Sequence, residues 1–125
     1  MEYILLNGDC NELLDTVKDN SIDLLLTDPP YGIDYQSCRS KADRKRKVIG
    51  DKQPCVDFIA KLPRLLKDTG AALIFTRWDK QQYTIDALDA AGIKAKSVII
   101  WDKCCHGMGN LKQENGRMHE SIVLD

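Results

Sequence analysis

Two consecutive prolines, Pro29 and Pro30, stand directly behind an apolar run at residues 22–27 and constrain the fold most strongly. Such a continuous apolar run is typical of a strand buried in a parallel sheet. Neither proline can donate a ladder hydrogen bond, because neither carries a backbone N–H. The sequence therefore predicts a buried strand that ends abruptly at Asp28-Pro29-Pro30-Tyr31.

Short apolar runs alternate with amphipathic stretches along the rest of the chain. The runs predict strands at residues 3–6, 22–27, 71–76, 97–101 and 120–124. Helical periodicity predicts helices over 10–18, 55–67 and about 79–91, with Pro63 kinking or restarting the second and Gly92 capping the third. Alternating strands and helices predict an α/β fold with a mostly parallel sheet.

Length and composition limit the classes of protein that fit. The chain has 125 residues, enough for one domain or less, and 43% hydrophobic with 30% charged residues argues against disorder. A net charge of -1 excludes a uniformly basic nucleic-acid-coating protein, so DNA binding requires a local patch. No apolar run approaches the roughly 18 residues of a membrane span, and the N-terminus does not resemble a signal peptide.

Cysteine usage points to a reducing compartment. The chain has five cysteines, an odd number, and no C-x-x-C spacing. Reduced thiols in a cytoplasmic protein fit this pattern better than a disulfide scaffold does. Cys104-Cys105-His106 lacks a second pair of ligands, so we expect no metal site.

The turn at 28–31 combines acceptors with an aromatic ring. Ligands of open parallel sheets bind at the carboxyl ends of the strands, so this turn should line a crevice. The Asp28 carboxylate and the carbonyl groups of the prolines, left unpartnered, would suit the exocyclic amine of a flat base beside Tyr31. The alternative is a proline turn in which Tyr31 merely packs.

A basic loop at residues 37–53 follows that turn and shows neither helical nor strand periodicity. It is rich in lysine and arginine, and the candidates for DNA phosphate contacts are Arg39, Lys41, Arg44, Lys45, Arg46 and Lys47. Phosphate binding needs clustered positive side chains rather than a particular sequence. The alternative is an ordinary solvated surface.

Several segments, in order, resemble one enzyme family. They are GDCNELL with LLLTDPPYG, IGDKQP, LPRLLKDTGAALIFTRWD, SVIIWDKCCHGMGN and RMHESIVL. Together they resemble the amino-methyltransferases that methylate DNA bases from S-adenosylmethionine, in the permuted beta group whose catalytic part precedes the cofactor-binding glycine loop. The resemblance implies an incomplete, Rossmann-like methyltransferase sheet, with residues 1–125 as the N-terminal catalytic part.

The resemblance also assigns roles to residues. Asp28 in this motif favours adenine N6 over cytosine N4 as the acceptor. Asp28 and the Pro29 carbonyl would accept from the amine, Pro30 would complete the turn, and Tyr31 would stack on a flipped base. Asp9, Cys10 and Asp28 would contact the cofactor, although Asp9 also fits a plain helix N-cap.

Some expected parts of the family are missing from the sequence. The F-x-G-x-G loop and a target-recognition region do not occur, so we expect the chain alone to be inactive and its catalytic strand to expose an unpaired edge. That edge could pair two copies into a homodimer. The alternative to an enzyme is a remnant that binds nucleic acid or serves as an interaction module. Trp78 and Trp101 are expected to pack or line a pocket, and His119-Glu120 to be structural.

Overall fold

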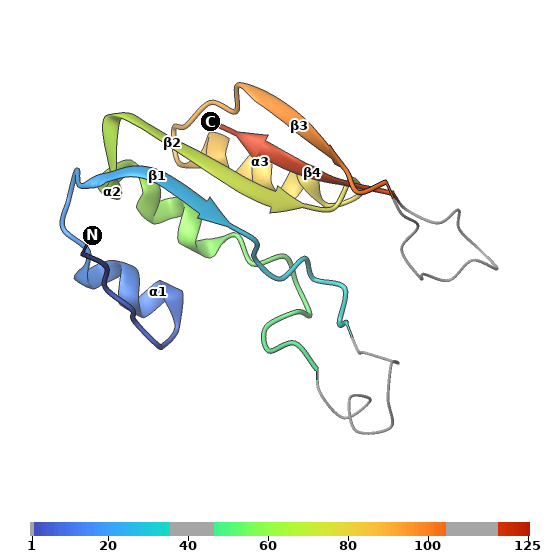
Figure 1. The fold of residues 1–125 in the computed structure, drawn as a ribbon, viewed down its shortest axis with the longest axis horizontal. Helices are drawn as coiled ribbons and strands as arrows, with labels where there is room; N and C mark the ends of the chain where they lie inside the picture. Colours follow the sequence, from blue (N-terminus) through green and yellow to red (C-terminus); the bar gives the residue numbers. More distant parts are fainter. Residues whose placement is uncertain (1, 36–46, 105–117) are drawn as a thin grey trace.

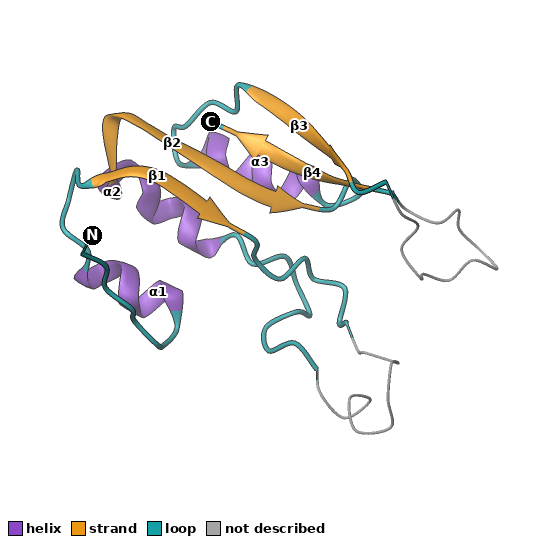
Figure 2. Cartoon of the chain, in the orientation of Figure 1, coloured by secondary structure: helices purple, strands orange, loops and turns teal. Residues whose placement is uncertain are grey.

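The computed structural model describes residues 2–35, 47–104 and 118–125. Its core is a four-stranded sheet with helices against one face (Figures 1 and 2). The strands are β1 (Ile22–Thr27), β2 (Leu66–Thr76), β3 (Ser97–Asp102) and β4 (His119–Leu124), in the order β1-β2-β4-β3. The helices are α1 (Cys10–Leu13), η1 (Leu14–Thr16), η3 (Asp57–Lys61), α2 (Leu62–Leu65) and α3 (Gln81–Ala90).

The sheet is mixed, yet most of its strands run in one direction. β1 pairs parallel with β2, whereas β4 pairs antiparallel with both β2 and β3. β1, β2 and β3 therefore share a direction and β4 alone is reversed. The predicted mostly parallel α/β sheet is confirmed for strand direction, while two of the three pairings are antiparallel.

Helices cover the sheet through a compact apolar core. Ile59 and Leu62 of the η3–α2 segment and Leu88 of α3 are fully buried against residues of β2 and β4, notably Ile74 and Val123. Full burial of one such side chain stabilises the fold by about 1.5–3 kcal/mol. The core therefore holds the helices η3, α2 and α3 as one layer against the sheet.

The helix ends follow local chemistry. Pro63 lies in the first turn of α2, where a missing N–H costs no intrahelical bond, and the chain changes there from 3₁₀ to α geometry. Gly92, with φ of +77°, follows α3 as the predicted cap. The helix predicted over 55–67 ends at Leu65 because β2 begins at Leu66, earlier than the predicted residue 71.

Three predictions of local structure were wrong. Residues 3–6 form no strand, and Ile4 and Leu5 are 87% and 89% exposed. Among the described residues no strand lies beside this segment, and an isolated strand leaves its backbone groups unsatisfied. The helix predicted over 10–18 is α-helical only to Leu13 and then 3₁₀ to Thr16. β1, predicted to be a buried strand, has no buried residue, because nothing in the described part of the chain covers one of its faces.

One face of the sheet is open in the described part of the chain. Leu24 and Leu26 of β1 are 54% and 62% exposed, and Ile99 and Trp101 of β3 lie on the same face. Among the described residues β1 is an edge strand that pairs with β2 alone, and the unpaired edge expected for this strand is present. None of the described helices is long and apolar enough to span a membrane.

We expect the chain alone to self-associate through β1, because pairing with a second copy would satisfy its free backbone groups. Sedimentation equilibrium should give a dimer mass for the unaltered chain and a monomer mass for Leu24→Lys, since a lysine on an edge strand opposes edge pairing. Tyr83→Lys, an exposed position on α3, is the matched control and should leave the dimer intact. A monomer at every concentration of the unaltered chain would contradict the expectation.

Candidate active site

The predicted site lies at the edge of the sheet where β1, β2 and β3 end and β4 begins (Figure 1). The turn 28–31 follows β1, residues 77–79 follow β2, and Lys103 follows β3. Glu120 lies at the start of β4, so it belongs to the same edge. The predicted place of the turn, at the carboxyl end of a strand, is confirmed.

Asp28 and Tyr31 form a hydrogen bond within that turn. The Tyr31 hydroxyl donates to Asp28 Oδ1. Burial raises the pKa of the Tyr31 phenol well above its ordinary value, and the hydrogen bond to Asp28 and the charges of Asp28 and Glu120 raise it further. The phenol therefore stays protonated and holds one Asp28 oxygen.

The prolines behave differently from one another. The Pro30 carbonyl accepts a hydrogen bond of 3.0 Å from the Cys55 N–H, and Tyr31 forms an isolated β-bridge with Pro54. The expectation that both carbonyl groups face the crevice unpartnered was thus wrong for Pro30, because the returning chain supplies a donor. Within the described residues, the Pro29 carbonyl accepts no hydrogen bond, so it is the acceptor beside Asp28 that is left for a ligand.

A buried carboxylate supports the segment after the turn. Asp51 is 3% exposed, and its Oδ1 accepts from the N–H groups of Gly32 (2.7 Å) and Ile33 (3.3 Å). Its Oδ2 accepts from the Tyr35 N–H at 2.7 Å. Gly32 has φ of +75°, and a Cβ there would lie 2.3 Å from the Pro54 nitrogen, so this close approach requires glycine.

Sequence reasoning did not single out Asp51. It occurs in the segment IGDKQP, which resembles the family but carries no role for the aspartate beyond an acidic residue after a glycine at the end of a basic loop. Nothing in that pattern shows that the carboxylate is buried, because its partners are backbone groups of residues 32–35, which carry no side-chain signature.

The residues predicted to bind the cofactor lie near the turn. Asp9 is the N-cap of α1 and accepts from the Asn11 N–H at 2.8 Å, so its local role is confirmed while a cofactor role stays a prediction. Burial raises the pKa of the Cys55 thiol, and neighbouring Cys10, Asp57 and Asp9 raise it further. The start of α1 therefore lies beside Cys55, which in turn binds Pro30.

Of the predicted DNA-binding residues, the structure describes Lys47. Its Nζ lies 3.0 Å from Asp34 Oδ2, and both side chains are about half exposed. A surface ion pair of this kind contributes at most about 1 kcal/mol, so a phosphate can compete for the lysine. Arg39, Lys41, Arg44, Lys45 and Arg46 lie outside the described residues.

Comparison with known proteins decides the family. The sequence profile of a family described as DNA methylase (N6_N4_Mtase) matches residues 22–124, most of the chain. The chain belongs to this DNA methylase family. It is 28% identical over 137 residues to the type II methyltransferase M.BglII of Bacillus subtilis, covering 94% of this chain and 33% of that protein. It is also 28% identical over 104 residues to YubD of Escherichia coli (strain K12), covering 78% and 42% of the two chains.

Solved structures show the same fold. The crystal structure of the M1.HpyAVI–SAM complex superposes with a TM-score of 0.65 at 19% identity, covering 95% of this methylase chain and 50% of that chain. A second crystal structure, of M1.HpyAVI, gives a TM-score of 0.64 at 19% identity and covers 94% of this chain and 51% of that chain. The sheet is thus the Rossmann-like sheet of the methyltransferases. The chain spans about half the length of these two neighbours and less than half the length of the two relatives.

At the same edge of the sheet, the ends of β2 and β3 and the start of β4 carry an aromatic and charged cluster. Trp101 packs edge-on against Phe75, with ring centroids 6.0 Å apart. The Lys103 Nζ lies 5.3 Å from the Trp101 ring centroid and forms an ion pair with Glu120. Trp101 is packed on one side and half exposed on the other, and the charge of Glu120, which pairs with Lys103, also contributes to the raised pKa of the Tyr31 phenol.

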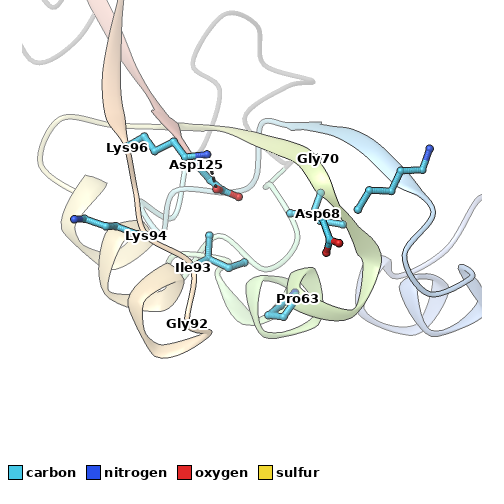
Figure 3. Close-up of a pocket in the computed structure, with 10 residues that line it drawn as sticks. Pro63, Asp68, Gly70, Gly92, Ile93, Lys94, Lys96 and Asp125 are labelled. Atoms are coloured by element: carbon cyan, nitrogen blue, oxygen red, sulfur yellow. Dashed lines mark ion pairs between the residues drawn. The ribbon is translucent and has the colours of Figure 1, made fainter.

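A shallow cavity lies at the opposite edge of the sheet, away from the turn (Figure 3). It has a volume of about 430 Å³ and is lined by residues such as Pro63, Gly70, Gly92 and Ile93. Lys96 and Asp125 form an ion pair of 3.9 Å across its rim. Within the described residues, no three histidine, cysteine or acidic side chains gather as a metal site.

The Tyr31 phenol should make the stability of the methylase sensitive to alkaline pH. Below about pH 10, the ordinary tyrosine pKa, the phenol is protonated in both the folded and the unfolded chain. As the pH rises above 10, the unfolded chain loses this proton first, so the free energy of unfolding should fall. Urea unfolding between pH 8 and 11 should show this loss, and Tyr31→Phe should reduce it. Tyr83→Phe, which removes an exposed phenol, should retain the full loss; equal slopes for unaltered chain and Tyr31→Phe would contradict the argument.

Proposed function

We propose that the complete protein transfers a methyl group from S-adenosylmethionine to the N6 amine of an adenine flipped out of duplex DNA. The observation that carries the proposal is the Asp28–Tyr31 turn at the carboxyl edge of a DNA methylase sheet, with the Pro29 carbonyl left as an acceptor. The neighbour M1.HpyAVI, crystallised with SAM, supports the choice of methyl donor. We place the reaction in the cytoplasm, in line with the reduced cysteines expected from the sequence.

The acceptor amine needs activation, because its lone pair is delocalised into the base. Hydrogen bonds from its two protons to Asp28 and the Pro29 carbonyl would draw the nitrogen toward tetrahedral geometry and stabilise its developing positive charge. Tyr31 holds one Asp28 oxygen, which orients the carboxylate and leaves its other oxygen for the amine. The new N–C bond would form as the S–C bond of the sulfonium breaks, the sulfur would keep the bonding pair as a neutral thioether, and the methylated amine would release one proton to solvent.

The donor would be held on the α1 side of the turn. Asp9 spends one carboxylate oxygen on the α1 N-cap and keeps the second, and Cys10 follows it beside Cys55. Oxygen acceptors at that place fit the hydroxyl groups and the cationic end of S-adenosylmethionine. When bound, the donor supplies the methyl group, and the protein aligns it for in-line attack.

Two alternatives remain distinct from this proposal. Cytosine N4 presents the same kind of exocyclic amine, and Asp28 in place of serine is the reason for preferring adenine. A protein without transferase activity that binds nucleic acid through the basic loop would keep DNA affinity and transfer nothing. The base that receives the label, or the absence of label, separates all three.

The transfer assay uses the complete open reading frame that contains these residues, duplex DNA and labelled S-adenosylmethionine. Label should appear on N6-methyladenosine after digestion to nucleosides. Asp28→Ala should lower the rate by about 100-fold or more, as expected for loss of a preorganised polar group. Asp23→Ala is the matched control, because Asp23 is an exposed carboxylate of the same strand that binds Lys67. Label on cytosine would overturn the base assignment, and an unchanged rate for Asp28→Ala would remove Asp28 from the mechanism.

The basic loop should supply phosphate contacts that are independent of DNA sequence. Replacing Arg44, Lys45, Arg46 and Lys47 with alanine should weaken binding to all duplexes equally. The slope of log K against log salt concentration should become shallower by about 0.9 for each phosphate contact that is lost. The control replaces Lys67, Lys94 and Lys96, which surround the cavity at the opposite edge. Fluorescence anisotropy at several salt concentrations measures both effects. An unchanged affinity and salt slope for the loop variant would make the loop a solvated surface.

A further inference from the structure

We propose that Asp51 is a positioning residue that locks the catalytic turn, by gathering the backbone of residues 32–35 so that Tyr31 reaches Asp28. It touches neither base nor donor, and it acts through Tyr31. The inference rests on the proposed function for its catalytic consequence, whereas the lock itself can be measured without any reaction.

The first argument is the environment of the carboxylate. A buried charge is costly unless hydrogen bonds compensate it. Asp51 pairs with no lysine or arginine in the described part of the chain, and three backbone N–H groups surround its two oxygens instead. Hydrogen bonds to a charged acceptor are roughly twice as strong as neutral ones. The carboxylate therefore fixes the backbone at Gly32, Ile33 and Tyr35 with one side chain.

The second argument is the continuity from Asp51 to Asp28. The Asp51 carbonyl accepts from the Asp34 N–H, and the Cys55 N–H donates to the Pro30 carbonyl. Tyr31 lies between these two attachments and bridges to Pro54. The backbone on both sides of Tyr31 is thus held in the position from which its hydroxyl reaches Asp28.

The third argument is that Asp51 lies outside the apolar core. The core consists of η3, α2 and α3 residues packed on β2 and β4. The backbone N–H groups that donate to the Asp51 carboxylate all lie in the segment after β1. Loss of the carboxylate should therefore alter the turn while the sheet and helices persist. A residue with a purely structural role would instead lower global stability and leave the folded turn unchanged.

The test compares Asp51→Asn with Ile59→Val in the 125-residue chain. Asparagine keeps the shape but turns one oxygen into a donor that faces N–H groups. Amide exchange of Gly32, Ile33 and Tyr35 should accelerate at least tenfold, and the ring carbon signal of Tyr31 should show its phenol ionising at lower pH than in the unaltered chain. Ile59→Val, a buried core change, should lower the melting temperature and move neither signal.

An Asp51→Asn chain that is folded and keeps the Tyr31 signals of the unaltered chain would overturn the inference. If this variant does not fold, the Asp28→Asn chain is titrated with acid instead, because Asp51 is then the carboxylate that remains near Tyr31. The amide signals of Gly32, Ile33 and Tyr35 and the ring signal of Tyr31 should change with one common midpoint. Separate midpoints would overturn the inference. In the complete protein, Asp51→Asn should lower kcat with little change in KM for S-adenosylmethionine. A complete protein that transfers no methyl group would defeat the proposed function while leaving the NMR result intact.

Discussion

The pairing of β2 with both β1 and β4 is the constraint on which the rest of the molecule depends. Ile74, near the carboxyl end of β2, faces the helices, and Ile59 and Leu88 pack on that side of the sheet. This packing fixes where β1 ends relative to β2. The Asp-Pro-Pro turn consequently emerges at an edge shared by three strands, and its missing N–H groups cannot extend the ladder beyond it.

From that edge, a second set of contacts makes a turn into a site. The core ends at β1 and does not reach residues 31–35, so the conformation there depends on hydrogen bonds rather than on apolar packing. Asp51, Cys55 and Gly32 supply the donors, acceptors and close approach that hold Tyr31. The structure thus separates a stabilising layer of helices from a polar lattice that shapes the acceptor group.

Much of this arrangement could be predicted from sequence, for identifiable reasons. The apolar run that ends before Asp28 and the glycine after α3 are local signals, because strand ends and helix caps depend on neighbours in the chain. Residues 3–6 misled, since apolar character predicts a strand but cannot supply the neighbouring strand that it needs. Asp51 was not predictable either, because its role depends on backbone groups brought together across 16 to 19 residues. The donor to the Pro30 carbonyl is hidden for the same reason.

The Asp51 carboxylate is buried and bound by backbone amides, whereas the basic loop is expected to carry exposed charges, so salt should affect the two differently. Salt screens exposed charges over a Debye length of about 8 Å at physiological ionic strength, and it screens buried groups much less. The strength of contacts between an exposed basic loop and phosphate would therefore depend on the salt concentration. The hydrogen bonds between the buried Asp51 carboxylate and residues 32–35 would depend on it much less. At rising ionic strength, phosphate contacts of the proposed kind should weaken long before the turn loses its shape.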